Sequence, residues 1–258
     1  MSSGFRIACL QINSGNDYRS NLATVSAMAR EAAGQGAQFI LTPEYALMMD
    51  GSGRVMRERA LAADGAPALG ELRALARELG VWFLAGSLTL RTDDDRIANR
   101  SFLISAEGRV VASYDKIHMF DVTLPDGRVI RESSTYRPGE RAVLAGTPWG
   151  RLGMTVCYDL RFPGLFRALA QAGAQFITVP SSFQRQTGKA HWHALLRARA
   201  PSKTNVSLLR QRCAAIIRAI ARPTAIRWSS TLGAKFLPRA AKRRRSSMPT
   251  SIPRAWQR

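Results

Sequence analysis

Short apolar runs alternate with amphipathic segments along most of the chain, and this alternation restricts the possible folds more than any other feature. Runs with the length of buried strands lie at residues 5–12, 38–45, 81–90, 151–160 and 175–183. Segments with apolar residues at helical spacing lie at residues 21–37, 71–80 and 162–174. Residues 99–120 predict two strands joined at the turn Glu107-Gly108. Strands that alternate with helices, some of them paired directly, predict an α/β layered fold with a mixed sheet.

The acidic residues are confined to the first part of the chain. Met1 to Asp159 holds all 18 Asp and Glu and 18 of the 38 Lys and Arg, so the net charge of +20 arises after Asp159. A nucleic-acid-binding domain is expected to carry its basic residues on one face of its fold. Here a neutral body is followed by an acid-free end. With 258 residues and 46% apolar content, the chain is long enough for one sizeable core.

The cysteines and the apolar runs bear on the compartment. Three cysteines, Cys9, Cys157 and Cys213, form a sparse and odd-numbered set that predicts reduced thiols and a cytoplasmic protein. No apolar run approaches the roughly 20 residues of a membrane span. The first residues, MSSGFRIACLQI, lack the pattern of a secretory signal. The three histidines form no cluster of ligands, and we expect neither a metal nor a cofactor.

Three reactive side chains follow three of the predicted strands. Glu44 ends FILTPE, Lys116 follows VVASYD, and Cys157 ends LGMTVC. Ligands of α/β sheets bind at the carboxyl ends of strands, so these residues form a candidate site. Taken singly, a buried cysteine is more often a small core residue, and a lone glutamate or lysine is more often a surface charge.

The sequence around these residues is similar to that of a known family. FILTPEY, YDKIHMFDV and GMTVCYDLRFPGLFRALAQAGAQFITVPSSF resemble the three signature blocks of the nitrilase superfamily, the carbon–nitrogen hydrolases. The resemblance covers about Phe5 to Ala200 and implies a four-layer αββα sandwich, incomplete at its C-terminal end. DVTLPDGRVIRESSTYRPGE and TGKAHWHALLRARA resemble the Nit branch, which includes deaminated glutathione amidase and omega-amidase.

The resemblance implies a catalytic set and a mechanism. Glu44, Lys116 and Cys157 match the family's catalytic residues, and Glu132 matches a second glutamate of its site. An amide is a poor electrophile, so it needs a strong nucleophile such as a thiolate. Glu44 would act as general base for Cys157 and later for water. Lys116 and the backbone N–H of Tyr158 would stabilise the oxyanion, and Glu132 would position Lys116 or the leaving ammonia.

The pattern changes after Ala200, where the Ala/Leu/Arg helix HWHALLRARA ends. The family continues there with residues of the type IENQ and YGHS.VVDPWG, which the chain lacks. Codons displaced by one base can encode AYGHSLVVDPWGEVLA under Arg222 to Pro238, and AIENQ under Pro201 to Asn205. We therefore predict a carbon–nitrogen hydrolase domain at residues 1–200 and an out-of-frame, poorly ordered basic tail at residues 201–258. A natural disordered basic tail is the alternative.

This reading has consequences for stability and function. Without the missing segment we expect exposed apolar surface and unpaired strand edges, hence a poorly soluble or inactive chain. The predicted function is cysteine-dependent hydrolysis of a small linear amide, with a small-molecule amide as partner, a homo-oligomer if the frame is intact, and no specific nucleic acid or membrane. The alternatives are a nitrilase or N-carbamoyl hydrolase of the same superfamily, an inactive product, or a basic nucleic-acid-binding protein.

Overall fold

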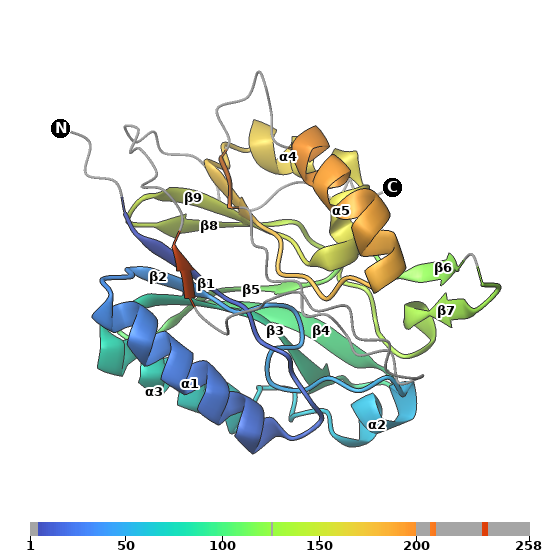
Figure 1. The fold of residues 1–258 in the computed structure, drawn as a ribbon, viewed down its shortest axis with the longest axis horizontal. Coiled ribbons are helices and arrows are strands. Elements are labelled where there is room, and N and C mark those ends of the chain that lie inside the picture. The colour runs from blue at the N-terminus through green and yellow to red at the C-terminus, as the bar shows by residue number, and fades with distance from the viewer. Residues whose placement is uncertain (1–4, 125, 200–206, 210–233, 237–258) are drawn as a thin grey trace.

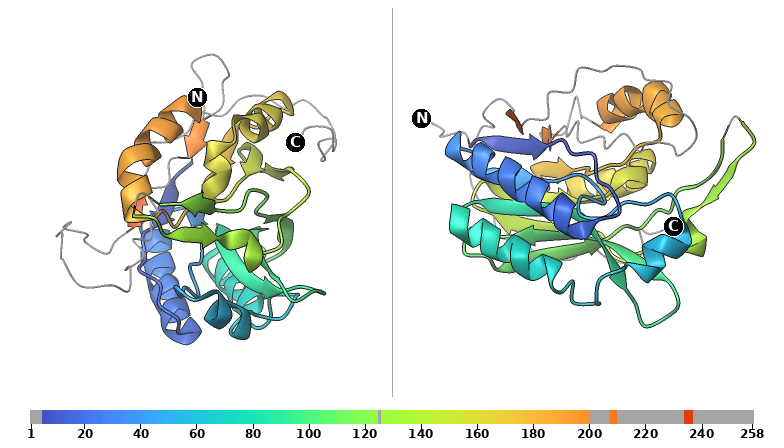
Figure 2. Two further views of the ribbon diagram at one scale, coloured as in Figure 1. Left: turned by 90° about the vertical axis from the view of Figure 1, so that its right-hand side faces the viewer. Right: turned by 60° about the horizontal axis from the view of Figure 1, so that its bottom comes forward.

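Two β-sheets packed face to face between helices form the molecule (Figures 1 and 2). The computed structural model describes residues 5–124, 126–199, 207–209 and 234–236. The helices are α1 (Tyr18–Gly34), α2 (Gly53–Glu58), α3 (Ala68–Leu79), α4 (Pro163–Gln171) and α5 (Arg185–Arg199). Two 3₁₀ turns, η1 (Glu132–Ser134) and η2 (Cys157–Arg161), follow strands and carry residues of the candidate site.

The larger sheet has the strand order β12-β1-β2-β3-β4-β5. Its strands are β1 (Ile7–Leu10), β2 (Phe39–Leu41), β3 (Trp82–Arg91), β4 (Ile97–Ile104), β5 (Val110–Asp115) and β12 (Ala234–Phe236). β1, β2 and β3 are parallel and are connected through helices, whereas β3, β4 and β5 are antiparallel neighbours. The sheet is therefore mixed, as the alternation in the sequence predicts.

The smaller sheet has the order β11-β10-β9-β8. Its strands are β8 (Val143–Thr147), β9 (Gly150–Met154), β10 (Phe176–Thr178) and β11 (Ser207–Leu209). A separate hairpin of β6 (Asp121–Thr123) and β7 (Val129–Arg131) projects from the body beyond the sheets (Figure 2). The sequence patterns did not predict β6, β7 or α2, because these segments are too short to show an apolar run or a helical period. The strand β8 was also missed, although its residues 143–145 are apolar.

Side chains of β1 show why the sheets are layered. Ile7 and Cys9 face one apolar cluster, which lies between the two sheets, and Ala8 and Leu10 face another, which lies under α1 and α3. Successive side chains of a strand point to opposite faces, so a continuous apolar run is buried on both sides. With α4 and α5 covering the smaller sheet, the layers are αββα (Figure 1). The predicted fold class is thus confirmed.

Two short strands from the predicted tail take part in the sheets. β11 pairs parallel with β10, and β12 pairs antiparallel with β1. The outer edges of β1 and β10 are therefore paired at these positions, which corrects the expectation of unpaired edges. An edge strand presents free N–H and C=O groups, and backbone pairing needs no particular side chains. The rest of the predicted tail at residues 201–258 lies outside the described residues.

The length and polarity of the helices bear on the expectation that the chain has no membrane span. In the described part of the chain, every helix is too short or too polar to span a bilayer.

Candidate active site

A cavity of about 800 Å³ opens at the ends of the central strands. Its walls contain all four charged or nucleophilic residues that the sequence singles out, Glu44, Lys116, Glu132 and Cys157. Tyr158 also lines it, together with residues of the β6–β7 hairpin and of the segment after β10. Glu44 and Cys157, which are 113 positions apart in the chain, thus line the same cavity.

Glu44 is held by backbone and side-chain donors on three sides. It follows β2 and is 1% exposed. Its Oε2 accepts a hydrogen bond of 2.8 Å from the Ser182 backbone N–H, and its Oε1 accepts one of 2.9 Å from Asn99 Nδ2. Its segment lies against a bulge of β3, where only glycine fits, because a Cβ on Gly86 would lie 2.1 Å from the Thr42 carbonyl oxygen. These contacts give the carboxylate one orientation.

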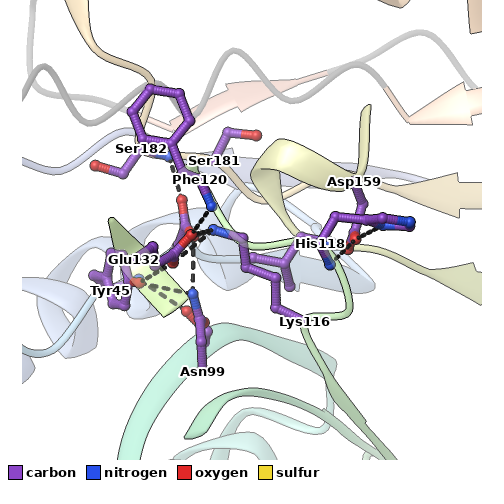
Figure 3. A network of polar contacts seen from close by, with 12 residues as sticks. Tyr45, Asn99, Lys116, His118, Phe120, Glu132, Asp159, Ser181 and Ser182 are labelled. Carbon is purple, nitrogen blue, oxygen red and sulfur yellow. Dashed lines mark hydrogen bonds and ion pairs between the residues drawn. The ribbon is translucent and has the colours of Figure 1, made fainter. Parts of the chain in front are cut away.

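Lys116 lies directly after β5 between two carboxylates. Its Nζ is 3.1 Å from Glu44 Oε1 and 2.8 Å from both carboxylate oxygens of Glu132 (Figure 3). The side chain is 2% exposed. The backbone of Lys116 is bound to β4 of the larger sheet, because its N–H donates a hydrogen bond of 3.0 Å to the Asn99 carbonyl. A buried ammonium with two carboxylate partners is a fixed positive charge in the cavity.

Cys157 begins a tight turn instead of ending a strand, which corrects the sequence-based placement. β9 ends at Met154, and the cysteine opens η2 with a φ of 48°. Its N–H donates to the Pro180 carbonyl at 2.9 Å. Tyr45, beside Glu44, is the other described non-glycine residue with positive φ, at 58°. Strained backbone of this kind persists where the surroundings hold it, and it gathers at functional sites.

Glu132 is joined to more of the site than the sequence indicates. Besides Lys116, its carboxylate accepts hydrogen bonds from Tyr45 Oη at 3.0 Å and from the Phe120 N–H at 2.5 Å. Asn99 Nδ2 donates to Tyr45 Oη at 2.8 Å, and so links the surroundings of both glutamates. Sequence patterns missed Tyr45, Asn99 and Ser182. Tyr45 and Ser182 lay within the quoted family blocks, and Asn99 stands at the start of a predicted strand with no motif to mark it.

Burial and the neighbouring charges together set the pKa values of Glu44, Lys116 and Cys157. Burial raises the pKa of Glu44 above its ordinary value, although Lys116 opposes the rise. Burial acts to lower the pKa of Lys116, but Glu132 and Glu44 outweigh it and hold that pKa well above its usual range. Burial and the Glu44 carboxylate raise the pKa of the Cys157 thiol, against the effect of Lys116. Lys116 therefore favours the thiolate, as expected, but the net direction favours the thiol.

The remaining sequence candidates lie around the cysteine turn. The Tyr158 ring makes edge contacts with Phe120 and Phe162, at centroid distances of 5.1 Å and 5.7 Å. His118 Nδ1 is 2.7 Å from the buried carboxylate of Asp159. His191 contacts Arg161 on the surface. In the part of the chain that the structure describes, no three His, Cys, Asp or Glu side chains are grouped as a metal site.

Removing the buried cation is expected to destabilise the fold. Lys116→Met keeps the length of the side chain but leaves the Glu44 and Glu132 carboxylates without their shared partner. We expect a loss of about 3–5 kcal/mol in the free energy of unfolding at neutral pH, measured by urea denaturation. The loss should shrink towards about pH 5, because without Lys116 the folded-state pKa of Glu44 rises further and protonation relieves the repulsion.

Arg54→Met is the matched control for this prediction. Arg54 pairs with Glu58 on α2, and both side chains are more than half exposed. Removing a surface ion pair costs about 0–1 kcal/mol. Equal losses in the two variants would contradict the view that Lys116 is required by two buried carboxylates.

The sandwich and its cavity define a class of protein, and a family comparison identifies it. The carbon-nitrogen hydrolase family model matches residues 6–203, and the chain belongs to that family. Within it, the chain is similar to deaminated glutathione amidase of Yersinia enterocolitica, 48% identical over 198 residues, which are 75% of this chain and 68% of that protein. Deaminated glutathione amidase of Homo sapiens is 40% identical over 201 residues, 75% of this chain and 61% of the human protein. The chain thus spans about two thirds or less of the length of these relatives.

A solved structure supports the same assignment. A mutant of the amidase from Nesterenkonia sp. AN1, with acrylamide added at its active site cysteine, superposes with a TM-score of 0.67 and 28% sequence identity. The superposition covers 79% of this chain and 76% of that one.

Proposed function

We propose that the protein hydrolyses the C–N bond of a small linear amide through a thioester on Cys157. The observation that carries the proposal is the buried arrangement of Glu44, Lys116 and Glu132 in the cavity wall that also holds Cys157. A nucleophile, a carboxylate base and a fixed cation in one cavity are the groups that acyl transfer requires. The relatives named as amidases support the same reaction class.

The protonation states suggest the order of proton transfers. In the resting state the raised pKa keeps Cys157 as a thiol. As sulfur attacks the amide carbon, Glu44 accepts the thiol proton, and the raised pKa of Glu44 makes this transfer easier. Lys116 and the Tyr158 N–H stabilise the oxyanion. Glu44 then gives the proton to the leaving nitrogen, which departs as ammonia from a primary amide and as an amine from a substituted amide such as deaminated glutathione.

The second half of the reaction uses the same groups. The thioester formed with Cys157 is attacked by a water molecule whose proton passes to Glu44. The C–S bond breaks, the thiol recovers the proton, and the product leaves as a carboxylate. Glu132 keeps Lys116 in place throughout, because both of its oxygens contact Nζ at 2.8 Å.

Charge at the mouth of the cavity favours an amide that also carries a carboxylate. Arg128 and Arg131 of the β6–β7 hairpin line the cavity. Arg128 is paired with Asp126 at 2.9 Å. Among the described residues, the Arg131 guanidinium has no hydrogen bond or close ion pair, and its electrostatic partner is Asp121, which lies opposite it in the hairpin. A guanidinium binds a carboxylate in a bidentate geometry. Deaminated glutathione is therefore the first substrate to test, and α-ketoglutaramate the second.

Loss of this guanidinium should affect binding more than turnover. For Arg131→Ala we expect KM to rise about fivefold for amides that carry a carboxylate, which corresponds to a loss of about 1 kcal/mol in binding free energy. kcat should stay the same, and KM for an uncharged amide of similar size should not change. Steady-state ammonia release measures both constants. Arg109→Ala, an exposed residue outside the cavity, serves as the control, and a similar change of KM for charged and neutral amides would contradict the role of Arg131.

Hydrolysis of a panel of compounds by the chain with its reading frame restored tests the proposal as a whole. Ammonia is measured for primary amides, and the released amine is measured for deaminated glutathione, whose amide nitrogens carry carbon substituents. The panel contains deaminated glutathione, α-ketoglutaramate, a neutral aliphatic amide, a nitrile and an N-carbamoyl amino acid. Release from amides alone supports the proposed function, whereas preferred turnover of the nitrile or the carbamoyl compound supports the other activities of the superfamily. Salt-dependent DNA binding without any hydrolysis would instead favour a nucleic-acid binder. A homo-oligomer and a cytoplasmic location stay predictions.

A further inference from the structure

The two groups that must act on the same carbonyl are attached to different sheets. Lys116 continues from β5 of the larger sheet, and Cys157 follows β9 of the smaller one. The backbone of each residue is hydrogen-bonded to nearby chain. The Lys116 N–H donates to the Asn99 carbonyl, and the Cys157 N–H donates to the Pro180 carbonyl. Apolar packing between sheets is not directional, so it does not by itself set the spacing of cation and nucleophile.

Asp159 lies where these two segments meet. It is two residues after Cys157, its side chain is 0% exposed, and it is absent from the cavity wall. Oδ2 accepts a hydrogen bond of 2.8 Å from the N–H of Val156, which directly precedes the cysteine. The Asp159 N–H donates to the Val156 carbonyl at 3.1 Å. The residue thereby closes the turn that holds Cys157 in its left-handed conformation.

The same carboxylate also binds the Lys116 segment, on both sides of the lysine. Oδ2 accepts from Tyr114 Oη at 2.7 Å. Oδ1 accepts from the His118 N–H at 3.1 Å and lies 2.7 Å from His118 Nδ1 (Figure 3). Tyr114 and His118 stand two residues before and two residues after Lys116. One buried carboxylate is thus bound to the chain that flanks the cation and to the chain that flanks the nucleophile.

We propose that Asp159 is a positioning residue that fixes Lys116 relative to Cys157 across the two sheets. The inference rests on the proposed function, since it explains how the cation and the nucleophile share one oxyanion. A carboxylate suits this role, because its two oxygens offer about four acceptor sites in fixed directions. Asparagine has nearly the same shape as aspartate, so the substitution leaves no cavity. One acceptor oxygen becomes an N–H donor that faces other donors, so the hydrogen bonds between the two segments are broken.

The role predicts an effect on kcat with little effect on KM. Asp159 does not line the cavity, so substrate binding should be retained. Misplacing a catalytic group by about 1 Å costs on the order of 10²-fold in rate. For Asp159→Asn we expect kcat per folded molecule to fall about 10- to 100-fold and KM to change less than about threefold. Tyr114→Phe, which removes one hydrogen bond and keeps the buried ring, should give a smaller fall in kcat.

Alkylation of Cys157 distinguishes positioning from simple destabilisation. The full chain is treated with iodoacetamide across a pH series, and modification of Cys157 is measured by peptide mass spectrometry. In Asp159→Asn the thiol should lose its fixed neighbours Glu44 and Lys116, and its pH profile should move to that of an ordinary thiol, with a midpoint of about 8.5. Asp64→Asn makes the same chemical change at an exposed turn and should leave the profile unchanged. Among the described residues, the Asp64 carboxylate accepts a hydrogen bond only from the Ala66 N–H.

Each outcome decides the proposal. A folded Asp159→Asn variant with a lowered melting temperature but unchanged kcat and alkylation profile would overturn it. If that variant does not fold, Tyr114→Phe and His118→Asn decide, and wild-type profiles in both would overturn it equally. A chain with the restored reading frame that hydrolyses no amide, while its Asp159 variants shift the alkylation profile as expected, contradicts the proposed function and leaves the positioning role of Asp159 supported.

Discussion

Replacing Cys157 with alanine is expected to lower the rate of ammonia release by at least about 10⁴-fold. Without the sulfur no thioester can form, and the remaining groups would have to activate water directly. Removal of the nucleophile from a covalent mechanism leaves only the catalysis due to binding and oxyanion stabilisation. The amide should still bind, because Cys157 is one of many cavity residues and the alanine side chain creates no clash.

The second buried thiol provides a matched control. Cys9 lies in β1 between the two sheets, is 3% exposed and takes no part in the cavity. Cys9→Ala should lose some stability through the volume removed from the core, and should keep its turnover per folded molecule. The measurement is ammonia release, normalised by the folded fraction from circular dichroism. Retained turnover in Cys157→Ala would remove this residue as nucleophile and with it the thioester mechanism.

If the reading frame is displaced near codon 200, restoring it is expected to produce a soluble, active protein, whereas the chain with residues 201–258 as printed is expected to be poorly soluble or inactive. The family match ends at residue 203, and the chain spans 61% to 68% of the two amidase relatives. In the described residues, β11 and β12 supply only three residues each to the edges of the sheets. Pairing of this length satisfies a few backbone groups, and we expect it to leave exposed much of the apolar surface that a complete sheet would cover.

The comparison of the two chains is direct. Both are expressed identically, and soluble yield, melting temperature and ammonia release are measured, with Cys157→Ala in the restored frame as the blank. Comparable turnover in the written and the restored chain would show that the out-of-frame interpretation of residues 201–258 is wrong. Sequencing the gene and finding no displaced frame of this kind would reject its premise.

The fold class could be predicted from the sequence, because burial on both faces of a strand leaves a visible pattern. The runs that became β1 and β2 are apolar without interruption, and the run of β3 is mostly apolar with Ser87 and Thr89 inside it. Their helical connections show a 3.6-residue period. Short elements with polar or mixed composition could not be predicted in this way. The β6–β7 hairpin carries no such pattern, yet it places Arg131 at the cavity.

The site was predicted in part for a related reason. Glu44, Lys116 and Cys157 follow apolar runs, so their position beside strand ends is visible from sequence alone. The turn at Cys157 was not visible, because a φ of 48° depends on what lies around the residue, here the Val156 and Asp159 contacts and the Pro180 carbonyl. Tyr45 and Asn99 have a place in the site only because separate strands bring their side chains to the two glutamates.

The sequence by itself determined the long apolar strands and the amphipathic helices, which residues are reactive, and where the acid-free end begins. Those properties are local, since they depend on the spacing of apolar and charged residues along the chain. Only the tertiary structure decided that Lys116 lies between two buried carboxylates and that Asp159 joins its segment to the cysteine turn. The contacts of Lys116 with Glu44 and Glu132, and of Asp159 with Tyr114, join residues 16 to 72 positions apart. Their strength depends on exclusion of water, which no short stretch of sequence specifies.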